Sequence, residues 1–303
     1  MLTLPEEFRH TITAVWGEEG KLWLDHLPAI IAACEKQWGL SITLLVPNLS
    51  YNFVAFAVRA DGTDAILKMG VPNKELATEI EALKLYQGRY AVQLLEANPN
   101  QGAMLLQRLT PGKPLSSLAN DEEATAIAAR LMRNLPMPAP TPNRSFPTIA
   151  HWALAFNRLR KRFDGKTGPL PHRMVDKAER LFQELQSSSS QDMLLHGDLH
   201  HENILLNGDN WLAIDPKGVI GDPTYEAARF LHNPIPGFLS MNQPRQVTQR
   251  RVEIIAQILK EEPSRILAWA YFDSVLSACW SIEDNTDWQY AMACAEIFDI
   301  MVK

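Results

Sequence analysis

The spacing of apolar residues changes once along this chain, close to the sequence TPGKPL at residues 110–115. Before that point, short runs rich in apolar and β-branched residues, at 42–46, 53–59 and 65–69, are separated by the polar stretches PNLS and RADGTD, which is typical of strands joined by turns. After it, apolar residues recur at intervals of three and four, which is typical of amphipathic helices. We therefore expect two lobes with different secondary structure.

The first lobe is predicted to contain a small antiparallel sheet with one internal helix. Residues 6–38 have helical spacing that is broken near Gly17 and Gly20, which predicts two helices before the sheet. The dipeptide DG at 61–62 predicts a hairpin. The stretch NKELATEIEALKLYQG predicts a helix capped by Gly88, and AVQLLEANPNQGAMLLQRL predicts two further strands around the turn NPNQG.

The second lobe is predicted to be mostly helical. The helices are expected at residues 121–134, 149–163, 172–186, 225–232, 244–259 and 263–280. Within this half only residues 193–215 have the pattern of strands. We place the lobes at 1–108 and 109–303, so the expected class is an α+β fold whose ligand site lies at the junction of its domains.

Composition limits the classes of partner. Lys and Arg number 29 against 35 Asp and Glu, a net charge of −6, which disfavours nucleic acid and suits a small cationic substrate. The cysteines Cys34, Cys279 and Cys294 form neither a CxxC motif nor a disulfide framework, as expected in a reducing compartment. No signal peptide or membrane-spanning run is visible. We expect a cytoplasmic protein, monomeric or weakly homodimeric, that does not bind membranes.

The stretch LLHGDLHHENILLNGDNWLAIDPKG, residues 194–218, concentrates polar residues within apolar strands. His196, Asp198 and His200 alternate, so in a continuous strand they would share a face and could bind zinc or iron. No other His pair or Cys cluster in the sequence completes such a site. A second interpretation starts from spacing: Asn203 follows Asp198 by five residues, and Asp215 follows an apolar strand. Kinases have the same order of a catalytic base, an Asn ligand and an Asp ligand for Mg²⁺.

This stretch resembles the catalytic loop of aminoglycoside phosphotransferases, which have the protein-kinase-like fold and carry HGD where protein kinases have HRD. The segments LWLDHLPAIIAACEKQWGL, LKMGVPNKELATEIEALKLYQG, AVQLLEANPNQGAMLLQRLTPGKPL and WLAIDPKGVIGDPTYEAARFLHNP are similar to the aminoglycoside/hydroxyurea antibiotic resistance kinase family, which includes streptomycin 6-kinases. The resemblance spans about Trp16 to Trp280. It implies a two-lobed fold and ATP- and Mg²⁺-dependent phosphorylation of a hydroxyl on a cationic aminoglycoside, streptomycin being the first expectation.

The resemblance also assigns roles to individual residues. Asp198 would be the catalytic base, or orient the acceptor hydroxyl, and Asn203 and Asp215 would bind Mg²⁺. Lys68, on the third expected strand, would hold the α- and β-phosphates of ATP. Glu79 on the following helix would pair with Lys68, with Glu75 and Glu81 as rivals.

The nucleotide site should include two segments, of which the first lacks the glycine-rich motif of protein kinases. Ser50, Tyr51 and Asn52 would form the phosphate loop, with an ordinary polar turn as the alternative. The hinge at 104–112 would contact adenine through backbone groups between Gln107 and Leu109.

Four residues of the second lobe are candidates for acceptor binding. Lys217 would contact a phosphate or the acceptor region, with a surface charge as the alternative. Glu283, Asp284 and Asp287 in WSIEDNTD would bind guanidinium or ammonium groups, although solvated acids at a helix end are the more ordinary interpretation.

The other polar residues of the loop are expected to support it. His196 would brace the loop, and His200 or His201 would either approach the substrate or pack within the loop. Asp222 should be a helix N-cap.

Two other functions fit the same residues. One is a kinase of another small metabolite, such as a sugar, an amino alcohol or a hydroxyurea-like compound. The other is a nucleotide-binding pseudokinase that serves as an interaction module, which the intact set of Lys68, Asp198, Asn203 and Asp215 disfavours.

Overall fold

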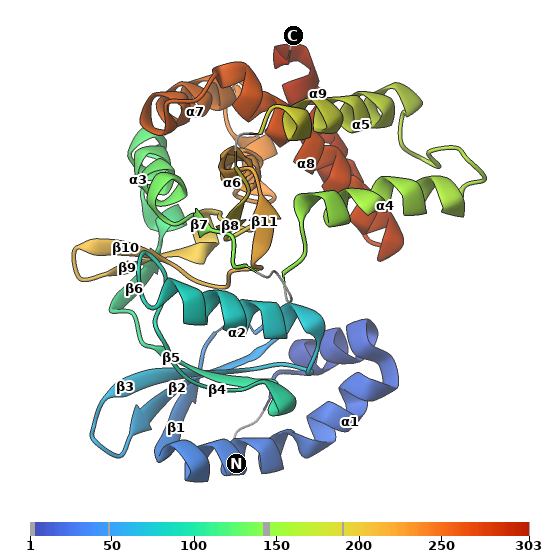
Figure 1. Cartoon of the computed structure of the whole chain (residues 1–303). Helices are drawn as coiled ribbons and strands as arrows, with labels where there is room; N and C mark the ends of the chain where they lie inside the picture. Colours follow the sequence, from blue (N-terminus) through green and yellow to red (C-terminus); the bar gives the residue numbers. More distant parts are fainter. Residues whose placement is uncertain (1–3, 48, 142–145, 190, 303) are drawn as a thin grey trace. The chain divides into compact units, whose positions relative to one another are not determined.

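Two units make up the chain, Met1–Gly112 and Lys113–Lys303 (Figure 1). The structure is a computed structural model that describes residues 4–47, 49–141, 146–189 and 191–302. The first unit consists of a sheet with two helices, and the second is mostly helical with two small sheets. Together they form the two-lobed α+β fold that the change in apolar spacing and the family resemblance predict.

A five-stranded antiparallel sheet of order β1-β2-β3-β5-β4 forms the first unit. The strands are β1 (Leu40–Leu45), β2 (Phe53–Arg59), β3 (Asp64–Met69), β4 (Leu94–Asn98) and β5 (Ala103–Gln107). In β2 the side chains of Phe53, Ala55 and Ala57 are buried in alternation, as expected for a strand with one face on a core. The DG dipeptide forms the hairpin turn between β2 and β3, with Gly62 at φ 84°. All five predicted strands are confirmed.

Two helices complete the first unit. Helix α1 (Glu6–Trp38) is interrupted at Gly17, where φ is 56° and ψ is −130°, so the two predicted helical segments form one bent element. Helix α2 (Lys74–Tyr86) begins at Asn73, whose Oδ1 accepts a hydrogen bond from the Leu76 N–H at 2.9 Å. Its C-cap is Gln87, so the predicted cap at Gly88 is wrong by one residue, although both residues have positive φ.

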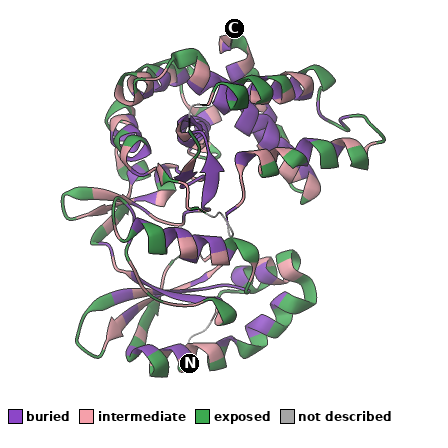
Figure 2. Ribbon diagram, viewed as in Figure 1, coloured by how far each residue is buried: buried purple, intermediate pink, exposed green. Residues whose placement is uncertain are grey.

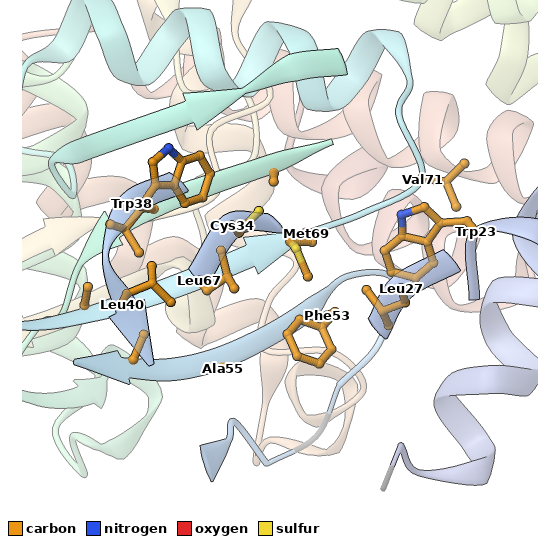
Figure 3. Packing of buried hydrophobic residues seen from close by; sticks show 14 of the residues in the cluster. Trp23, Leu27, Cys34, Trp38, Leu40, Phe53, Ala55, Leu67, Met69 and Val71 are labelled. Atoms are coloured by element: carbon orange, nitrogen blue, oxygen red, sulfur yellow. The ribbon is translucent and has the colours of Figure 1, made fainter. Parts of the chain in front are cut away.

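The core of the first unit lies between α1 and the sheet (Figure 3). Phe53 and Met69 are directly paired across β2 and β3 and are fully buried. Cys34 and Trp38 from α1 belong to the same apolar cluster. The cysteine therefore serves as a core thiol, as expected, and burial raises its pKa to about 11.

Phe53→Ala is expected to lower the free energy of unfolding by about 3–5 kcal/mol, because it removes a fully buried ring and leaves a cavity. Leu44→Ala, on the neighbouring strand and 63% exposed, should change it by less than about 0.5 kcal/mol. Urea denaturation of both variants measures the difference. Equal effects would show that Phe53 is not a core residue.

Seven helices of five residues or more are described in the second unit. They are α3 (Asp121–Asn134), α4 (Ile149–Arg162), α5 (His172–Ser187), α6 (Glu226–Leu231), α7 (Pro244–Leu259), α8 (Pro263–Glu283) and α9 (Gln289–Met301). The first and last residues of the first six helices agree with the predicted bounds to within three residues. Helix α9 was not predicted. Its sequence QYAMACAEIFDIM has apolar residues on most sides, which obscures a helical period.

Helix α8 is the central element of this unit. Figure 2 shows it buried along most of its length, and it packs against α4, α5, α6 and α9. Within the described part of the chain, no helix combines the length and apolar character needed to cross a membrane.

Two small sheets position the polar stretch at 194–218. In one sheet, strand β8 (Met193–Leu195) lies between β7 (Met137–Pro138) and β11 (Val219–Gly221). In the other, β9 (Ile204–Asn207) lies between β10 (Asn210–Ala213), with which it forms a hairpin, and β6 (Pro111–Pro114). The strands predicted within 193–215 are confirmed as β8, β9 and β10. Strands β6, β7 and β11 were not predicted. Strands β6 and β7 contain proline, which argues against a strand in a sequence, and β11 lies beyond the range in which strands were expected.

Candidate active site

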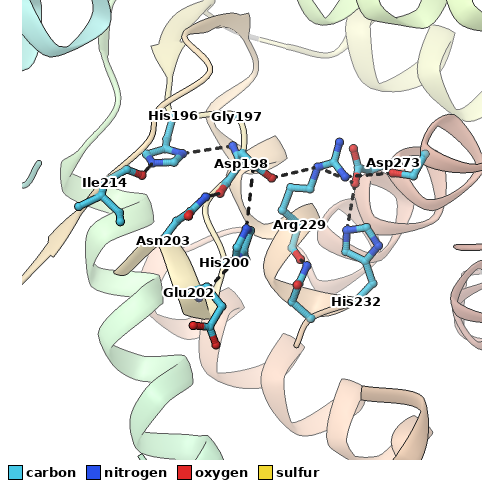
Figure 4. A network of polar contacts seen from close by, with 12 residues as sticks. His196, Gly197, Asp198, His200, Glu202, Asn203, Ile214, Arg229, His232 and Asp273 are labelled. Carbon is cyan, nitrogen blue, oxygen red and sulfur yellow. Dashed lines mark hydrogen bonds and ion pairs between the residues drawn. The ribbon is translucent and has the colours of Figure 1, made fainter. Parts of the chain in front are cut away.

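The polar stretch forms a loop between β8 and β9 that contains Asp198 (Figure 4). The loop bends at Gly197, whose φ is 79°, a conformation that favours glycine. A Cβ added at Gly197 would lie 2.7 Å from Val219 Cγ1 and 3.0 Å from the Trp152 ring. The backbone is therefore enclosed by side chains on that side, which fixes the position of the next residue, Asp198.

One buried carboxylate, that of Glu226 at the start of α6, holds this backbone. Its two oxygens accept hydrogen bonds from the N–H groups of His196 and of Gly197, the second at 3.1 Å. Glu226 is 1% exposed, so burial raises its pKa to about 7 although the two N–H groups act in the opposite direction. No local pattern in the sequence indicates Glu226, because its partners are 29 and 30 residues away.

His196 braces the loop, as expected from the sequence. Its Nδ1 accepts a hydrogen bond from the Asp198 N–H at 3.2 Å, so the proton is on Nε2, which donates to the Ile214 carbonyl at 2.7 Å. The side chain is fully buried, and burial lowers its pKa to about 4. A neutral ring with both nitrogens engaged is a structural element, since neither nitrogen remains for a metal.

The other two histidines have different surroundings. His201 is buried and its ring stacks on Phe230 with centroids 4.1 Å apart, so it packs within the unit. His200 is more accessible: Nδ1 accepts from the Glu202 N–H at 3.2 Å, and Nε2 lies 4.0 Å from Asp198 Oδ2. Among the residues that the structure describes, no three His, Cys, Asp or Glu side chains are arranged to hold a metal ion.

The Asp198 carboxylate is partly accessible, with 24% of its side chain exposed. Burial works to raise its pKa, but the charges of Arg229, His200 and Lys217 lower it below its usual value. Arg229 Nε lies 3.8 Å from Asp198 Oδ1. Asp198 is therefore ionised at neutral pH, the state that a proton acceptor requires.

Asn203 and Asp215 lie on two segments joined by a hydrogen bond. The Ile214 N–H donates to the Asn203 carbonyl at 2.9 Å, directly before Asp215. Asn203 Nδ2 donates to the Asp198 carbonyl at 2.9 Å, which orients the amide of that side chain. Asp215 has φ 58°, a strained conformation for a residue other than glycine that is often found at functional sites. The structure thus brings Asp198, Asn203 and the Asp215 segment together.

A buried polar network lies behind Asp198 and was not predicted from the sequence. Arg229 Nε lies 3.4 Å from Asp273 Oδ2, and Asp273 accepts a hydrogen bond from the Tyr225 hydroxyl (Figure 4). His232 Nε2 lies 3.2 Å from the same Asp273 oxygen. A charged residue within the otherwise apolar sequence ILAWAYFDSVLSACW of α8 is the one signal that could have indicated this site.

Two partly exposed tryptophans flank the loop. Trp152 of α4 and Trp280 of α8 meet edge to face with centroids 5.6 Å apart, and the Arg229 guanidinium lies 5.3 Å from the centre of the Trp280 ring. Trp152 also contacts the enclosed side of Gly197. Aromatic ring faces can contact cationic groups, as Trp280 here contacts Arg229.

The predicted acceptor residues differ in their surroundings. Both oxygens of Glu283 are bound by Arg158, at 2.7 and 3.1 Å, so its charge is neutralised within the fold. Asp284 is exposed at the C-terminal end of α8, and Asp287 is exposed nearby in the sequence. The Lys217 N–H donates to the His196 carbonyl, and the charge of its side chain lowers the pKa of Asp198.

Asp222 has the structural role that was expected. Its Oδ1 caps the turn before α6 by accepting from the Thr224 N–H at 2.8 Å, and its other oxygen is paired with Arg265.

In the first unit, Lys68 and Glu79 form a buried ion pair. Lys68 lies on β3 between Val54 of β2 and Met104 of β5, and its Nζ donates to Glu79 Oε1 at 2.6 Å. The rival Glu81 pairs instead with Lys84 on the surface of α2. Glu75, the other rival, is exposed, so the structure pairs Lys68 with Glu79, the residue that the sequence pattern favoured.

The expected nucleotide segments of the first unit are placed as follows. Ser50 and Tyr51 are exposed between β1 and β2, and Asn52 Oδ1 packs against the backbone of Gly70. The Gln107 N–H donates to the Gln93 carbonyl at 2.9 Å, and Leu109 is largely buried. The backbone N–H of Gln107 is thus already satisfied by the sheet.

Glu226→Gln is expected to remove a pH-dependent loss of stability. Since the fold raises this pKa from 4.5 to about 7, the folded state binds more protons between these values, and stability falls as pH rises through them. At about 1.36 kcal/mol per pKa unit, the loss is about 3 kcal/mol.

The measurement is the free energy of unfolding at about pH 5 and about pH 8. The difference between Glu226→Gln and the wild type should shift by that amount in favour of the variant at the higher pH. Glu184→Gln, on the exposed face of α5, is the control and should show no such shift. A parallel response of wild type and Glu226→Gln would contradict the assignment.

Comparison with known proteins agrees with this geometry. The model of the aminoglycoside/hydroxyurea antibiotic resistance kinase family matches residues 38–285. A streptomycin 6-kinase of Streptomyces glaucescens is 28% identical over 288 residues, covering 94% of this chain and 93% of that protein. A hydroxyurea phosphotransferase of Kitasatospora aureofaciens is 30% identical, covering 94% of this chain and 82% of that protein.

A solved structure shares the fold at low sequence identity. A choline/ethanolamine kinase family protein of Mesorhizobium loti superposes with a TM-score of 0.64 at 15% identity, covering 93% of this chain and 95% of that one. The fold is therefore the protein-kinase-like fold. The chain belongs to the aminoglycoside/hydroxyurea antibiotic resistance kinase family and is a phosphotransferase that acts on a hydroxyl group.

Proposed function

We propose that this protein transfers the γ-phosphate of ATP to a hydroxyl group of an aminoglycoside, with streptomycin as the first candidate acceptor. The observation that carries the proposal is the Asp198 loop, in which an ionised, partly exposed carboxylate is held beside Asn203 and the Asp215 segment. A phosphoryl acceptor needs its proton removed or oriented, and its phosphate charge neutralised by a hard cation. The loop supplies residue types for both tasks.

Each residue then has a chemical role. Asp198 accepts the proton of the attacking hydroxyl. The amide oxygen of Asn203 and the carboxylate of Asp215 are the kinds of ligand that Mg²⁺ prefers. Lys68, held in place by Glu79, binds the α- and β-phosphates. A bound metal ion would neutralise negative charge on the transferred phosphate. Lys217 adds positive charge near Asp198.

The choice of acceptor rests on charge and on the relatives. The chain carries a net charge of −6, which favours a cationic molecule over an anionic one. Asp284 and Asp287 remain exposed for such a ligand, whereas Glu283 is engaged by Arg158. Streptomycin 6-kinases are 28 and 29% identical over most of the chain, which supports streptomycin as the first compound to test.

Hydroxyurea or a similar small hydroxylated compound is the second candidate acceptor. The hydroxyurea phosphotransferase is as similar to this chain as the streptomycin kinases are. Both reactions require the same loop residues, so the loop does not distinguish them.

The acceptor can be identified by measuring ATP consumption with streptomycin, other aminoglycosides, hydroxyurea and simple polyols. NMR of the product locates the phosphate. We expect turnover with streptomycin and phosphate on one of its hydroxyl groups. Turnover with hydroxyurea alone would replace the lead candidate, and ATP binding without turnover of any hydroxyl compound would contradict the proposed function.

Asp198→Asn should lower kcat by about 10²–10⁴-fold, because the amide cannot accept the hydroxyl proton. Binding of ATP with Mg²⁺ should remain close to wild type, measured by isothermal titration calorimetry. A variant that retains near-wild-type kcat would refute the role of Asp198 as base or orienting group.

Lys68→Met should lower kcat/KM for ATP by about 10²–10³-fold, the size of effect seen when one charge-stabilising donor is removed. Lys84→Met is the matched control, since Lys84 also pairs with a glutamate of α2 but at the surface. Steady-state kinetics with varied ATP should separate the two variants. Similar kinetics in both would show that Lys68 does not bind nucleotide.

A further inference from the structure

One short helix, α6, contacts the Asp198 loop at two points. Glu226, the first residue of the helix, binds the N–H groups of the two residues before Asp198. Phe230, one turn later, stacks on the ring of His201. Residues four apart lie on one face of a helix, so both contacts come from the same side of α6. They lie at the two ends of the loop, since His201 begins the turn that ends at Asn203.

His201 takes part in this contact as a flat aromatic ring. It is 4% exposed, and its ring centroid lies 4.1 Å from that of Phe230 at an interplanar angle of 16°, which is a nearly parallel stack. Among the residues that the structure describes, neither of its ring nitrogens finds a hydrogen-bond partner. Burying polar atoms without hydrogen bonds costs free energy. The ring face, and not the nitrogens, therefore accounts for the position of His201.

The turn that begins at His201 sets the direction of the Asn203 side chain. The Asn203 N–H donates to the His200 carbonyl at 3.0 Å, which closes the turn. From this position Asn203 Nδ2 donates to the Asp198 carbonyl at 2.9 Å. An amide that is bound through its nitrogen has its oxygen in a defined direction. The direction of the Asn203 oxygen therefore depends on where the backbone of His201 lies.

A buried arginine holds Phe230 from another helix. Arg251 of α7 is fully buried, and its Nη1 donates to the carbonyls of Phe230 and Asn233 at 3.3 and 2.6 Å. The centre of its guanidinium lies 5.2 Å from the centre of the Phe230 ring. Asp121, the first residue of α3, accepts a hydrogen bond from Arg251 Nε at 3.0 Å and balances its charge. Phe230 is thus fixed through both its backbone and its ring.

We propose that the stack of His201 on Phe230 holds Asn203 in the geometry needed for phosphoryl transfer. His201 and Phe230 are then positioning residues. The hydrogen bonds at the other end of the loop fix the backbone before Asp198, and the stack adds the restraint at the Asn203 end. Residues that orient a metal ligand typically change metal affinity or activity by about 10–100-fold. The proposal rests on the proposed function for the roles of Asp198 and Asn203.

Three variants separate the ring face from the other properties of His201. His201→Ala removes the stack, whereas His201→Phe keeps a flat ring without the nitrogens. Phe230→Leu keeps an apolar side chain but removes the flat face. Phe182→Leu is the matched control, because Phe182 of α5 stacks on Phe272 of α8 in the same unit and at the same interplanar angle of 16°.

Amide hydrogen exchange of peptides that cover residues 196–204, measured by mass spectrometry, reports on the loop without any acceptor. In His201→Ala and Phe230→Leu these amides should exchange about tenfold faster than in the wild type, because the loop opens locally. His201→Phe and Phe182→Leu should match the wild type there. Peptides of α9 are the internal reference and should be unchanged in all four variants, which separates a loosened loop from general unfolding.

Binding of ATP at several Mg²⁺ concentrations gives a second measurement, by isothermal titration calorimetry. The dissociation constant of Mg²⁺ from the ATP complex should rise by about 10–100-fold in His201→Ala and stay close to wild type in His201→Phe. Where acceptor turnover is established, kcat should fall in His201→Ala while the KM of the acceptor stays near wild type. His201→Phe should restore kcat.

A loop exchange rate or a Mg²⁺ affinity that is unchanged in His201→Ala would overturn the proposal. So would a His201→Phe variant that behaves like His201→Ala, because the nitrogens and not the ring face would then be required. Equal loosening of the loop by Phe182→Leu would also overturn it. If His201→Ala does not fold, Phe230→Leu provides the same test. Failure of the wild type to phosphorylate any hydroxyl compound would instead refute the proposed function, and the exchange rates would still decide the role of the stack.

Discussion

The candidate site depends on one interaction, the acceptance of two backbone N–H groups by the buried carboxylate of Glu226. These N–H groups belong to the two residues directly before Asp198. The interaction ties the loop to the start of α6, a helix of only six residues. Arg229 lies one turn further along the same helix, so the element that fixes the loop backbone also places a positive charge near Asp198. Backbone position and electrostatics are thus coupled through α6, and α8 holds both by packing against it.

The parts of the site that could be predicted are those whose residues lie close together in the sequence or on a recognisable strand or helix. The spacing of Asp198, Asn203 and Asp215 is contained within eighteen residues, and strand context identified Lys68 and favoured Glu79. Strands and helices longer than about five residues were found for the same reason, because a period needs several repeats to be visible. Helix α9 was missed because its apolar residues surround the axis.

The rest of the site could not be read from the sequence, because its interactions join distant segments. Glu226 contacts residues 29 and 30 positions away, and Tyr225 contacts Asp273 across 48 positions. The loop histidines had the opposite effect: they are conspicuous in the sequence, yet His196 and His201 are buried and neutral. Charge is costly in an apolar interior, so a buried histidine is usually a structural residue unless an anion or a metal compensates it.

The enclosure of Gly197 restricts how this loop can change over time. Both Val219 and Trp152 lie within 3.0 Å of where a Cβ would be, and the positive φ disfavours any side chain as well. Protein kinases carry arginine at the equivalent position of their motif, but a single substitution toward that sequence would have to displace the contacts from α4 and β11 together. A change from glycine to arginine at this position therefore requires several coordinated substitutions. Variation in the range of acceptors is expected to arise in the surrounding helices, while the loop stays constant.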